Sequence, residues 1–221
     1  MIVLGIEGAL GGFSAAIARD GVIVASDEQA GNVALERGLA SIEAVMRDAG
    51  VDRHELTRLA VGNGPGGFTG LRITIAYAKS LAQAWNLPLV AVSSFDLQEY
   101  GIDRARVLGI VAGRPGIVSV RYRDGSDVRR ASGPIASTLA AVLPEPDARP
   151  LTVVAGPEGV LAELAEGGYI VESLTPLVRP AAAAAALAAT SAHPAASPHE
   201  VRADYGEAPA AKVPDLPRRR T

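Results

Sequence analysis

The chain contains no cysteine, and only three of its 221 residues are histidine. The absence of cysteine excludes a disulfide scaffold, a thiolate-bound zinc site and thiol chemistry. The histidines, His54, His193 and His199, show none of the spacings that place two imidazoles on one helix face. We therefore expect no metal site built from the protein's own side chains.

Long apolar runs and an excess of basic residues are absent too. The longest unbroken apolar stretch, residues 181–189, is about half of what a membrane-spanning helix requires. The first residues are apolar but lack the basic start and the length of a secretory signal. With 21 Lys and Arg against 24 Asp and Glu, the net charge is −3, and no basic stripe indicates a nucleic-acid-binding surface. These features predict a cytoplasmic protein that makes no membrane contact.

An internal repeat relates the two halves of the chain. Residues 3–6 recur at 107–110, and Arg19-Asp20-Gly21 recurs as Arg123-Asp124-Gly125, both at an offset of 104 positions. In each copy, two apolar runs flank a glycine-rich turn, and an Asp-Gly pair follows. This pattern predicts three antiparallel strands with a tight hairpin at the Asp-Gly pair. The repeat therefore predicts two similar lobes.

Beyond these hairpins the pattern alternates between helix and strand. We expect strands at 59–62, 89–92, 151–155 and 169–172, helices at 32–49, 69–85, 137–143, 159–166 and 180–189, and a short helix that starts at Ser94. Asp52 and Glu55 have the spacing of a capping box. The order of elements predicts an α/β fold in which each lobe has a mixed sheet with flanking helices. The predicted boundaries are 1–102 for the first lobe, 103–192 for the second, and 193–221 for a Pro- and Ala-rich, partly disordered tail.

A glycine-rich loop follows the strand expected at 59–62. Its glycines and proline are Gly62, Gly64, Pro65, Gly66, Gly67 and Gly70. Such a loop between a strand and a helix can aim backbone N–H groups at an anion. However, Pro65 removes one donor, and Phe68 stands where a phosphate-binding loop would need lysine. Two interpretations stay open: a phosphate cradle, or a loop that positions a helix capped by Thr69 for a subunit contact.

The same region carries a family resemblance. Residues 60–73, AVGNGPGGFTGLRI, followed by AKSLA at 78–82, resemble the motif of the TsaB (YeaZ) family. The similarity covers the first half of the chain and returns weakly at 201–207. It implies an actin-like, sugar-kinase-like fold of two duplicated lobes, each with a mixed five-stranded sheet and flanking helices. It also implies a role in making threonylcarbamoyladenosine at position 37 of tRNA.

The resemblance also implies partners. A member of this family binds the catalytic paralogue TsaD through helices of its first half, and the ATPase TsaE joins the pair. The protein is then expected to contact tRNA only indirectly, through its partners. When no partner is present, it is expected to form a homodimer. No cofactor is required, and binding of ATP or ADP is in doubt. The residues that this resemblance assigns to the partner-binding interface are Leu35, Leu39, Ile42, Phe68, Thr69, Leu71, Arg72, Ile75 and Lys79. Of these, Leu35, Leu39 and Ile42 could serve either the interface or the core. The spacing alone predicts an inward stripe formed by Leu71, Ile75, Ala78, Ala82 and Trp85.

Several positions depart from the family pattern. The chain has Glu7-Gly8-Ala9 where relatives usually have Asp-Thr-Ser, and in phosphotransferases of this fold that aspartate serves the nucleotide's metal or the attacking water. The second half has Ala112-Gly113-Arg114 in place of Asp-Ala-Arg. These changes favour a non-catalytic subunit in which Glu7 marks a vestigial nucleotide site. The alternative is a nucleotide-dependent phosphotransferase or ATPase with Glu7 as its acid and the segments 64–67 or 156–159 near the phosphates.

Overall fold

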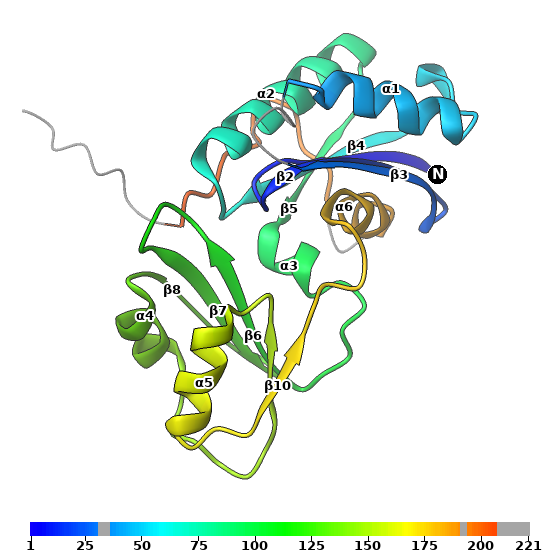
Figure 1. Ribbon diagram of the computed structural model, residues 1–221. Coiled ribbons are helices and arrows are strands. Elements are labelled where there is room, and N and C mark those ends of the chain that lie inside the picture. The colour runs from blue at the N-terminus through cyan, green and yellow to red at the C-terminus, as the bar shows by residue number, and fades with distance from the viewer. Residues whose placement is uncertain (31–35, 191–193, 207–221) are drawn as a thin grey trace, which may run out of the picture.

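The computed structural model describes residues 1–30, 36–190 and 194–206, which form two lobes, each built on a five-stranded sheet (Figure 1). The strands of the first lobe are β1 (Ile2–Glu7), β2 (Gly12–Arg19), β3 (Val22–Ala30), β4 (Arg58–Gly64) and β5 (Leu89–Ser93). Those of the second are β6 (Arg106–Ala112), β7 (Val118–Asp124), β8 (Asp127–Gly133), β9 (Leu151–Val154) and β10 (Val171–Leu174).

The two sheets have the same topology. Their orders are β3-β2-β1-β4-β5 and β10-β9-β6-β7-β8, and in each sheet the first three strands in the sequence are antiparallel, whereas the last two join in parallel. Because β6 to β10 take the places of β1 to β5, the duplication predicted from the repeat is confirmed. The hairpin loops differ by one position. Asp20 and Gly21 form the first loop as expected, but Asp124 pairs with Asp127, so the second loop is 125–126.

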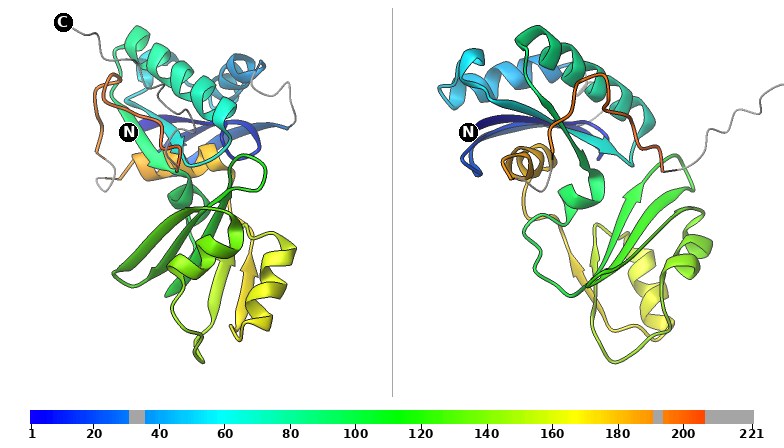
Figure 2. Two further views of the ribbon diagram at one scale, coloured as in Figure 1. Left: turned by 90° about the vertical axis from the view of Figure 1, so that its left-hand side faces the viewer. Right: turned by 180° about the vertical axis from the view of Figure 1, so that it is seen from behind.

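Helices cover the two sheets unequally. They are α1 (Gly38–Asp48), α2 (Phe68–Trp85), α3 (Ser94–Gln98), α4 (Ile135–Val142), α5 (Glu158–Glu166) and α6 (Pro180–Ala188), with a short 3₁₀ helix η1 (Arg53–Glu55). In the first lobe α1 and α2 cover one face of the sheet and α6 covers the other (Figures 1 and 2). In the second lobe α4 and α5 lie on one face, and α3 lies between the lobes. None of the helices within the described ranges is both long and apolar enough to cross a bilayer.

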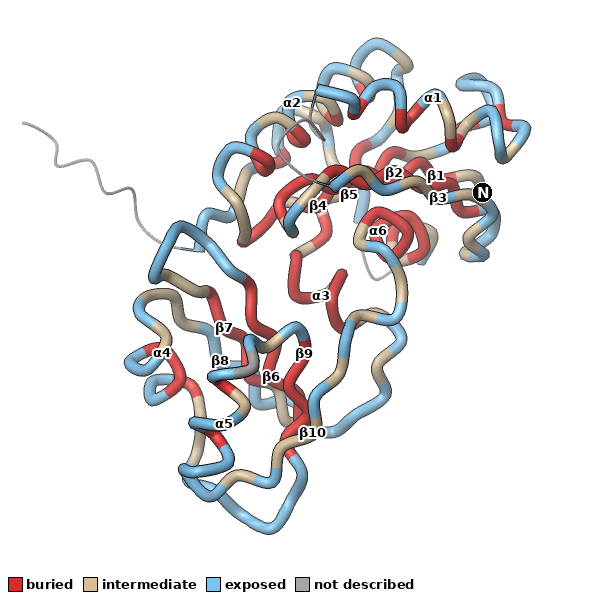
Figure 3. Tube along the Cα trace, viewed as in Figure 1, coloured by how far each residue is buried: buried red, intermediate tan, exposed pale blue. Residues whose placement is uncertain are grey.

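The main core lies between the first sheet and the helices α1 and α2. Leu4, Ile6 and Phe13 from the sheet pack there with Ile42 of α1 and Leu71 of α2. Figure 3 shows the buried inner sides and the exposed outer sides of the two helices. Burial of large aliphatic side chains on this scale is the main stabilising contribution to such a lobe. The expected capping box is present in η1.

The last helix belongs to the first lobe. We expected α6 within the second lobe, inside the range 103–192, but its alanines pack against Val3, Ala18 and Ala60 of the first sheet. The physical reason is the small size of the facing residues: a Cβ placed on Gly5 would lie 2.2 Å from the Ala181 carbonyl oxygen. Only glycine and alanine allow a helix backbone to come this close to a strand. The chain therefore returns to the first lobe after β10.

Part of the expected tail is ordered on the first lobe as well. Ala196 forms an isolated bridge with Leu89 at the start of β5, and Val201 is buried in the main core. The segment 194–206 then runs beside α2 and ends next to the second lobe (Figure 2). The part 194–206 of the expected tail is therefore docked on the first lobe, and residues 207–221 of that tail lie outside the described residues.

An ion-pair cluster joins the two lobes. Arg121 of β7 lies 2.5 Å from a carboxylate oxygen of Asp96 in α3 and 2.9 Å from one of Glu99. Arg123 contacts the same Glu99 at 3.3 Å. The side chains of Arg121 and Glu99 are both buried, so their charges are compensated by the partners within this cluster rather than by water.

Candidate functional site

The glycine loop between β4 and α2 packs against two other backbone segments. The Gly67 N–H donates to the Ala9 carbonyl oxygen at 2.8 Å. A Cβ on Gly70 would lie 1.8 Å from the Gly8 carbonyl oxygen, and one on Gly64, whose φ is +104°, would lie 2.1 Å from that of Asp204. Close backbone approach therefore accounts for glycine at positions 64 and 70. This outcome favours the interpretation of a loop that positions a helix.

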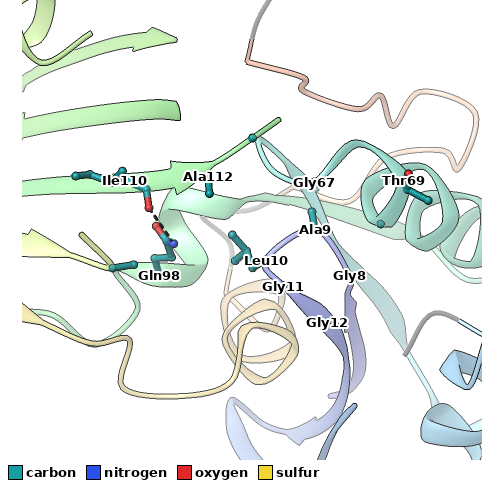
Figure 4. Close-up of a pocket in the computed structure, with 13 residues that line it drawn as sticks. Gly8, Ala9, Leu10, Gly11, Gly12, Gly67, Thr69, Gln98, Ile110 and Ala112 are labelled. Carbon is teal, nitrogen blue, oxygen red and sulfur yellow. Dashed lines mark hydrogen bonds between the residues drawn. The ribbon is translucent and has the colours of Figure 1, made fainter. Parts of the chain in front are cut away.

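A cavity of about 700 Å³ lies between the lobes (Figure 4). Its lining residues are Gly8, Ala9, Leu10, Gly11, Gly12, Gly67, Thr69, Gly70, Gln98, Ile110, Ala112, Gly113 and Ala155. Only Thr69 and Gln98 among them have polar side chains, and none is ionisable. The Gln98 amide donates to the Ile110 carbonyl oxygen at 3.3 Å, which joins the end of α3 to β6. Within the described ranges, no group of three or more His, Asp and Glu side chains is placed to hold a metal ion.

Glu7, the residue assigned to a vestigial nucleotide site, is not among the residues that line this cavity. Its side chain is 2% exposed, and its two carboxyl oxygens accept the backbone N–H groups of Ala9 at 2.6 Å and Leu10 at 3.3 Å. Burial raises the pKa of Glu7 to about 7, and the negative charge of Glu28 adds to this, although the backbone N–H groups act in the opposite direction. The Glu7 carboxyl group thus accepts hydrogen bonds from backbone N–H groups of the kind that a phosphate-binding turn donates to a phosphate.

The other segments of the phosphotransferase alternative contribute little to the cavity lining. Of 64–67 only Gly67 lines the cavity, and none of 156–159 is among the lining residues, although the preceding Ala155 is. Gly156 is in close contact with its own strand, since a Cβ there would lie 2.5 Å from a Val153 methyl carbon. The geometry therefore gives this alternative little support.

The residues expected at the partner-binding interface fall into two groups. Ile42, Leu71 and Ile75 are buried in the main core. Ile42 therefore has the core role that the sequence leaves open for it, and Leu71 and Ile75 lie on the inward stripe that their spacing predicts, rather than on the surface that the resemblance implies. Their side chains form the inward stripe of α1 and α2, which holds the helices on the sheet. The outward group contains Leu39, 49% exposed, and Phe68, 53% exposed, with Thr69 and Arg72 exposed and Lys79 partly exposed. Leu35 lies outside the described residues.

Thr69 does not have the role that we expected from the sequence. The helix α2 begins at Phe68, its N-cap residue is Gly67, and no side chain caps it. Thr69 is instead in the first turn, where it lines the cavity. The helix that we expected from residue 32 begins in the described residues at Gly38.

An aromatic and cationic cluster covers the start of α2. The rings of Phe68 and Tyr205 lie 5.3 Å apart, and the Arg72 guanidinium lies 3.9 Å from the centre of the Phe68 ring. The Arg72 Nε donates to the Tyr205 hydroxyl oxygen at 3.2 Å. We name Phe68, Arg72 and Tyr205 the α2 cluster.

Sequence reasoning missed Tyr205. Two hydrogen bonds to Asn63 hold the segment around it: the Asp204 N–H donates to the Asn63 main-chain carbonyl oxygen at 2.7 Å, and the Asn63 side-chain amide donates to the Arg202 carbonyl oxygen at 3.3 Å. The available signal was the weak return of the family pattern at 201–207. A pairing across more than 130 positions leaves no local periodicity from which to predict it.

Comparison with known proteins identifies the family. The family model for tRNA N6-adenosine threonylcarbamoyltransferase (TsaD) matches residues 28–191. The chain is 33% identical over 122 residues to the tRNA threonylcarbamoyladenosine biosynthesis protein TsaB of Escherichia coli, and the match covers 53% of either chain. It thus spans about half the length of that curated relative.

Solved structures have the same fold. YeaZ from Pseudomonas aeruginosa superposes with a TM-score of 0.72 at 20% identity, covering 92% of this chain and 99% of that one. The activator of the 2-hydroxyisocaproyl-CoA dehydratase from Clostridium difficile gives 0.53 at 11% identity, with 86% and 94% covered. The expected actin-like, duplicated fold is confirmed. The chain belongs to the tRNA N6-adenosine threonylcarbamoyltransferase family, and its relatives place it in the TsaB (YeaZ) branch.

Proposed function

We propose that this protein is a non-catalytic partner subunit in the synthesis of threonylcarbamoyladenosine at position 37 of tRNA. It binds and stabilises TsaD, the catalytic subunit, through the outward faces of α1 and α2. The observation that carries the proposal is the start of α2, where Phe68 and Arg72 are exposed beside each other. Large aromatic and Arg side chains of this kind often dominate protein–protein interfaces.

The chemistry of the inter-lobe cavity supports the non-catalytic part of this proposal. Its lining offers no carboxylate to activate water and no cation to neutralise a phosphate, and Glu7 is turned toward its own loop. Phosphoryl transfer depends on such charged groups around the transferred phosphate. The proposed role requires no cofactor, and neither ATP nor ADP has a part in it.

The remaining partners follow from the same role. TsaE joins the pair of TsaB and TsaD, and the tRNA is held by the complex rather than by this chain alone. In the absence of TsaD, the outward face of α1 and α2 forms a homodimer, because an exposed apolar surface gains stability when it is covered.

The proposal is tested in cells and with purified protein. Depletion of the protein should lower the threonylcarbamoyladenosine content of total tRNA, as measured by mass spectrometry, and the wild-type chain should restore it. The purified chain should show no transfer activity alone and should elute with TsaD in size-exclusion chromatography. Unchanged tRNA modification after complete depletion would contradict the proposal.

A further inference from the structure

The α2 cluster has a more specific role, and the argument for it rests on the proposed function. We infer that Phe68, Arg72 and Tyr205 are the centre of the docking surface, and that the Arg72 guanidinium binds a carboxylate of the partner protein. The partner would present an Asp or Glu side chain with apolar groups beside it. The cluster thereby sets which protein is bound.

The first argument is the way in which Arg72 is held. Its guanidinium lies over the Phe68 ring, is 5.8 Å from the centre of the Tyr205 ring, and uses Nε for the Tyr205 hydroxyl. Stacking and one hydrogen bond fix the plane of the group but leave Nη1 and Nη2 available. A guanidinium that is already oriented loses less entropy when it binds a planar carboxylate through two parallel hydrogen bonds.

The second argument is charge. No carboxylate in the described part of the chain forms an ion pair with Arg72, and α2 has no Asp or Glu anywhere between Phe68 and Trp85. Within the described part of the docked segment, Asp204 is next to Tyr205 in the sequence, and its carboxylate accepts the backbone N–H of Gly206 at 2.8 Å. Among the described residues the Arg72 cation thus has no carboxylate partner, so a carboxylate of a partner protein would complement its charge.

The third argument concerns the platform. Tyr205 comes from a segment that is anchored on both sides of the ring: Val201 is buried in the main core, and a Cβ on Gly206 would lie 2.3 Å from the Ser119 hydroxyl oxygen of the second lobe. The aromatic pair is thus in place before a partner arrives. Preorganised aromatic groups increase affinity because they lose little conformational freedom on binding.

The chemistry favours a protein carboxylate over an RNA phosphate. A surface that binds the RNA backbone needs several uncompensated cations, since each contact neutralises one phosphate. On the second lobe, three exposed arginines, Arg104, Arg129 and Arg149, form ion pairs with carboxylates of this chain, and the exposed Arg130 lies over the Phe95 ring. Around Arg72 the neighbouring groups are aromatic rather than basic.

The test measures binding of purified TsaD from the same organism by isothermal titration calorimetry. We expect Arg72→Ala and Tyr205→Ala to weaken binding by about tenfold or more each. Arg72→Lys should not restore wild-type affinity, because lysine keeps the charge but not the planar fork. Tyr205→Phe removes only the hydroxyl and should weaken binding less than Tyr205→Ala. Arg129→Ala, on the second lobe, is the matched control and should bind as the wild type does.

The outcomes separate this inference from the proposed function. If the wild-type chain does not bind TsaD, the proposed function fails and the inference falls with it. If the wild type binds but Arg72→Ala and Tyr205→Ala bind equally well, the inference alone is overturned. An Arg72-dependent affinity for tRNA without TsaD, in a filter-binding assay, would overturn it in favour of a phosphate. Unchanged thermal unfolding of all variants will show that folding does not explain the losses.

Discussion

Because the carboxyl group of Glu7 is buried, we expect the free energy of unfolding to decrease as the pH rises. Its pKa is raised from 4.5 to about 7 in the folded chain, which corresponds to about 3 kcal/mol between the two protonation states. Below pH 4.5, Glu7 is protonated in both the folded and the unfolded chain, and this stability is fully present. As the pH rises toward 7, the unfolded chain releases the proton first, so the free energy of unfolding falls.

The substitution Glu7→Gln tests this reasoning. Glutamine keeps an oxygen that accepts the Ala9 N–H but carries no charge, so the variant should lack the decrease between pH 5 and 8. We expect the stability difference, variant minus wild type, to increase by up to about 3 kcal/mol over this range. Urea unfolding followed by circular dichroism at pH 5, 6, 7 and 8 measures it. The unfolding free energies of variant and wild type are compared at the same pH. The pH dependence that comes from Asp27, Asp147 and other carboxylates with lowered pKa values is common to both chains and therefore cancels.

The matched control is Glu43→Gln, which removes an exposed carboxylate from α1. Its unfolding free energy should follow the wild type at every pH. Parallel curves for wild type and Glu7→Gln would show that burial does not hold the Glu7 proton, and would refute the reasoning.

Three further substitutions test the packing. Leu71→Asp places a charge in the main core, so we expect a loss of about 3 kcal/mol or more and a largely unfolded chain by circular dichroism; a stable fold would contradict the burial of α2's inward stripe. Gly70→Ala forces a methyl group against the Gly8 carbonyl oxygen and should lower stability by about 2 kcal/mol in urea unfolding. Arg121→Ala removes the ion pair with Asp96 and one of the two Arg partners of the buried Glu99, and should cost about 3 kcal/mol in the same assay; a change below about 0.5 kcal/mol would show that the inter-lobe cluster does not stabilise the fold.

Most of the fold follows from local patterns in the sequence. The repeat at an offset of 104 predicted two equivalent sheets, because each copy carries its own apolar runs and its own Asp-Gly turn. The capping box of Asp52 and Glu55 was also predictable, since it depends on residues three apart. Such features are encoded within a few positions, where periodicity and turn chemistry are informative.

Long-range placement was not predictable in the same way. The alanine stretch of α6 is apolar on all sides, so its sequence does not indicate which sheet it covers. For Leu71 the helical spacing predicted an inward position, whereas the resemblance placed it with Phe68 at the interface; the structure has Leu71 buried and Phe68 exposed. The docking of Tyr205 on Phe68 depends on the path of the whole chain.

The central claim is that the start of α2 binds TsaD, and one comparison tests it most directly. Phe68→Asp changes a residue that is 53% exposed at this surface, and Ile170→Asp changes one that is equally exposed, at 53%, on the second lobe. In calorimetric titrations with TsaD, we expect Phe68→Asp to abolish measurable binding and Ile170→Asp to leave the affinity unchanged. Equal affinities for the two variants would contradict the claim.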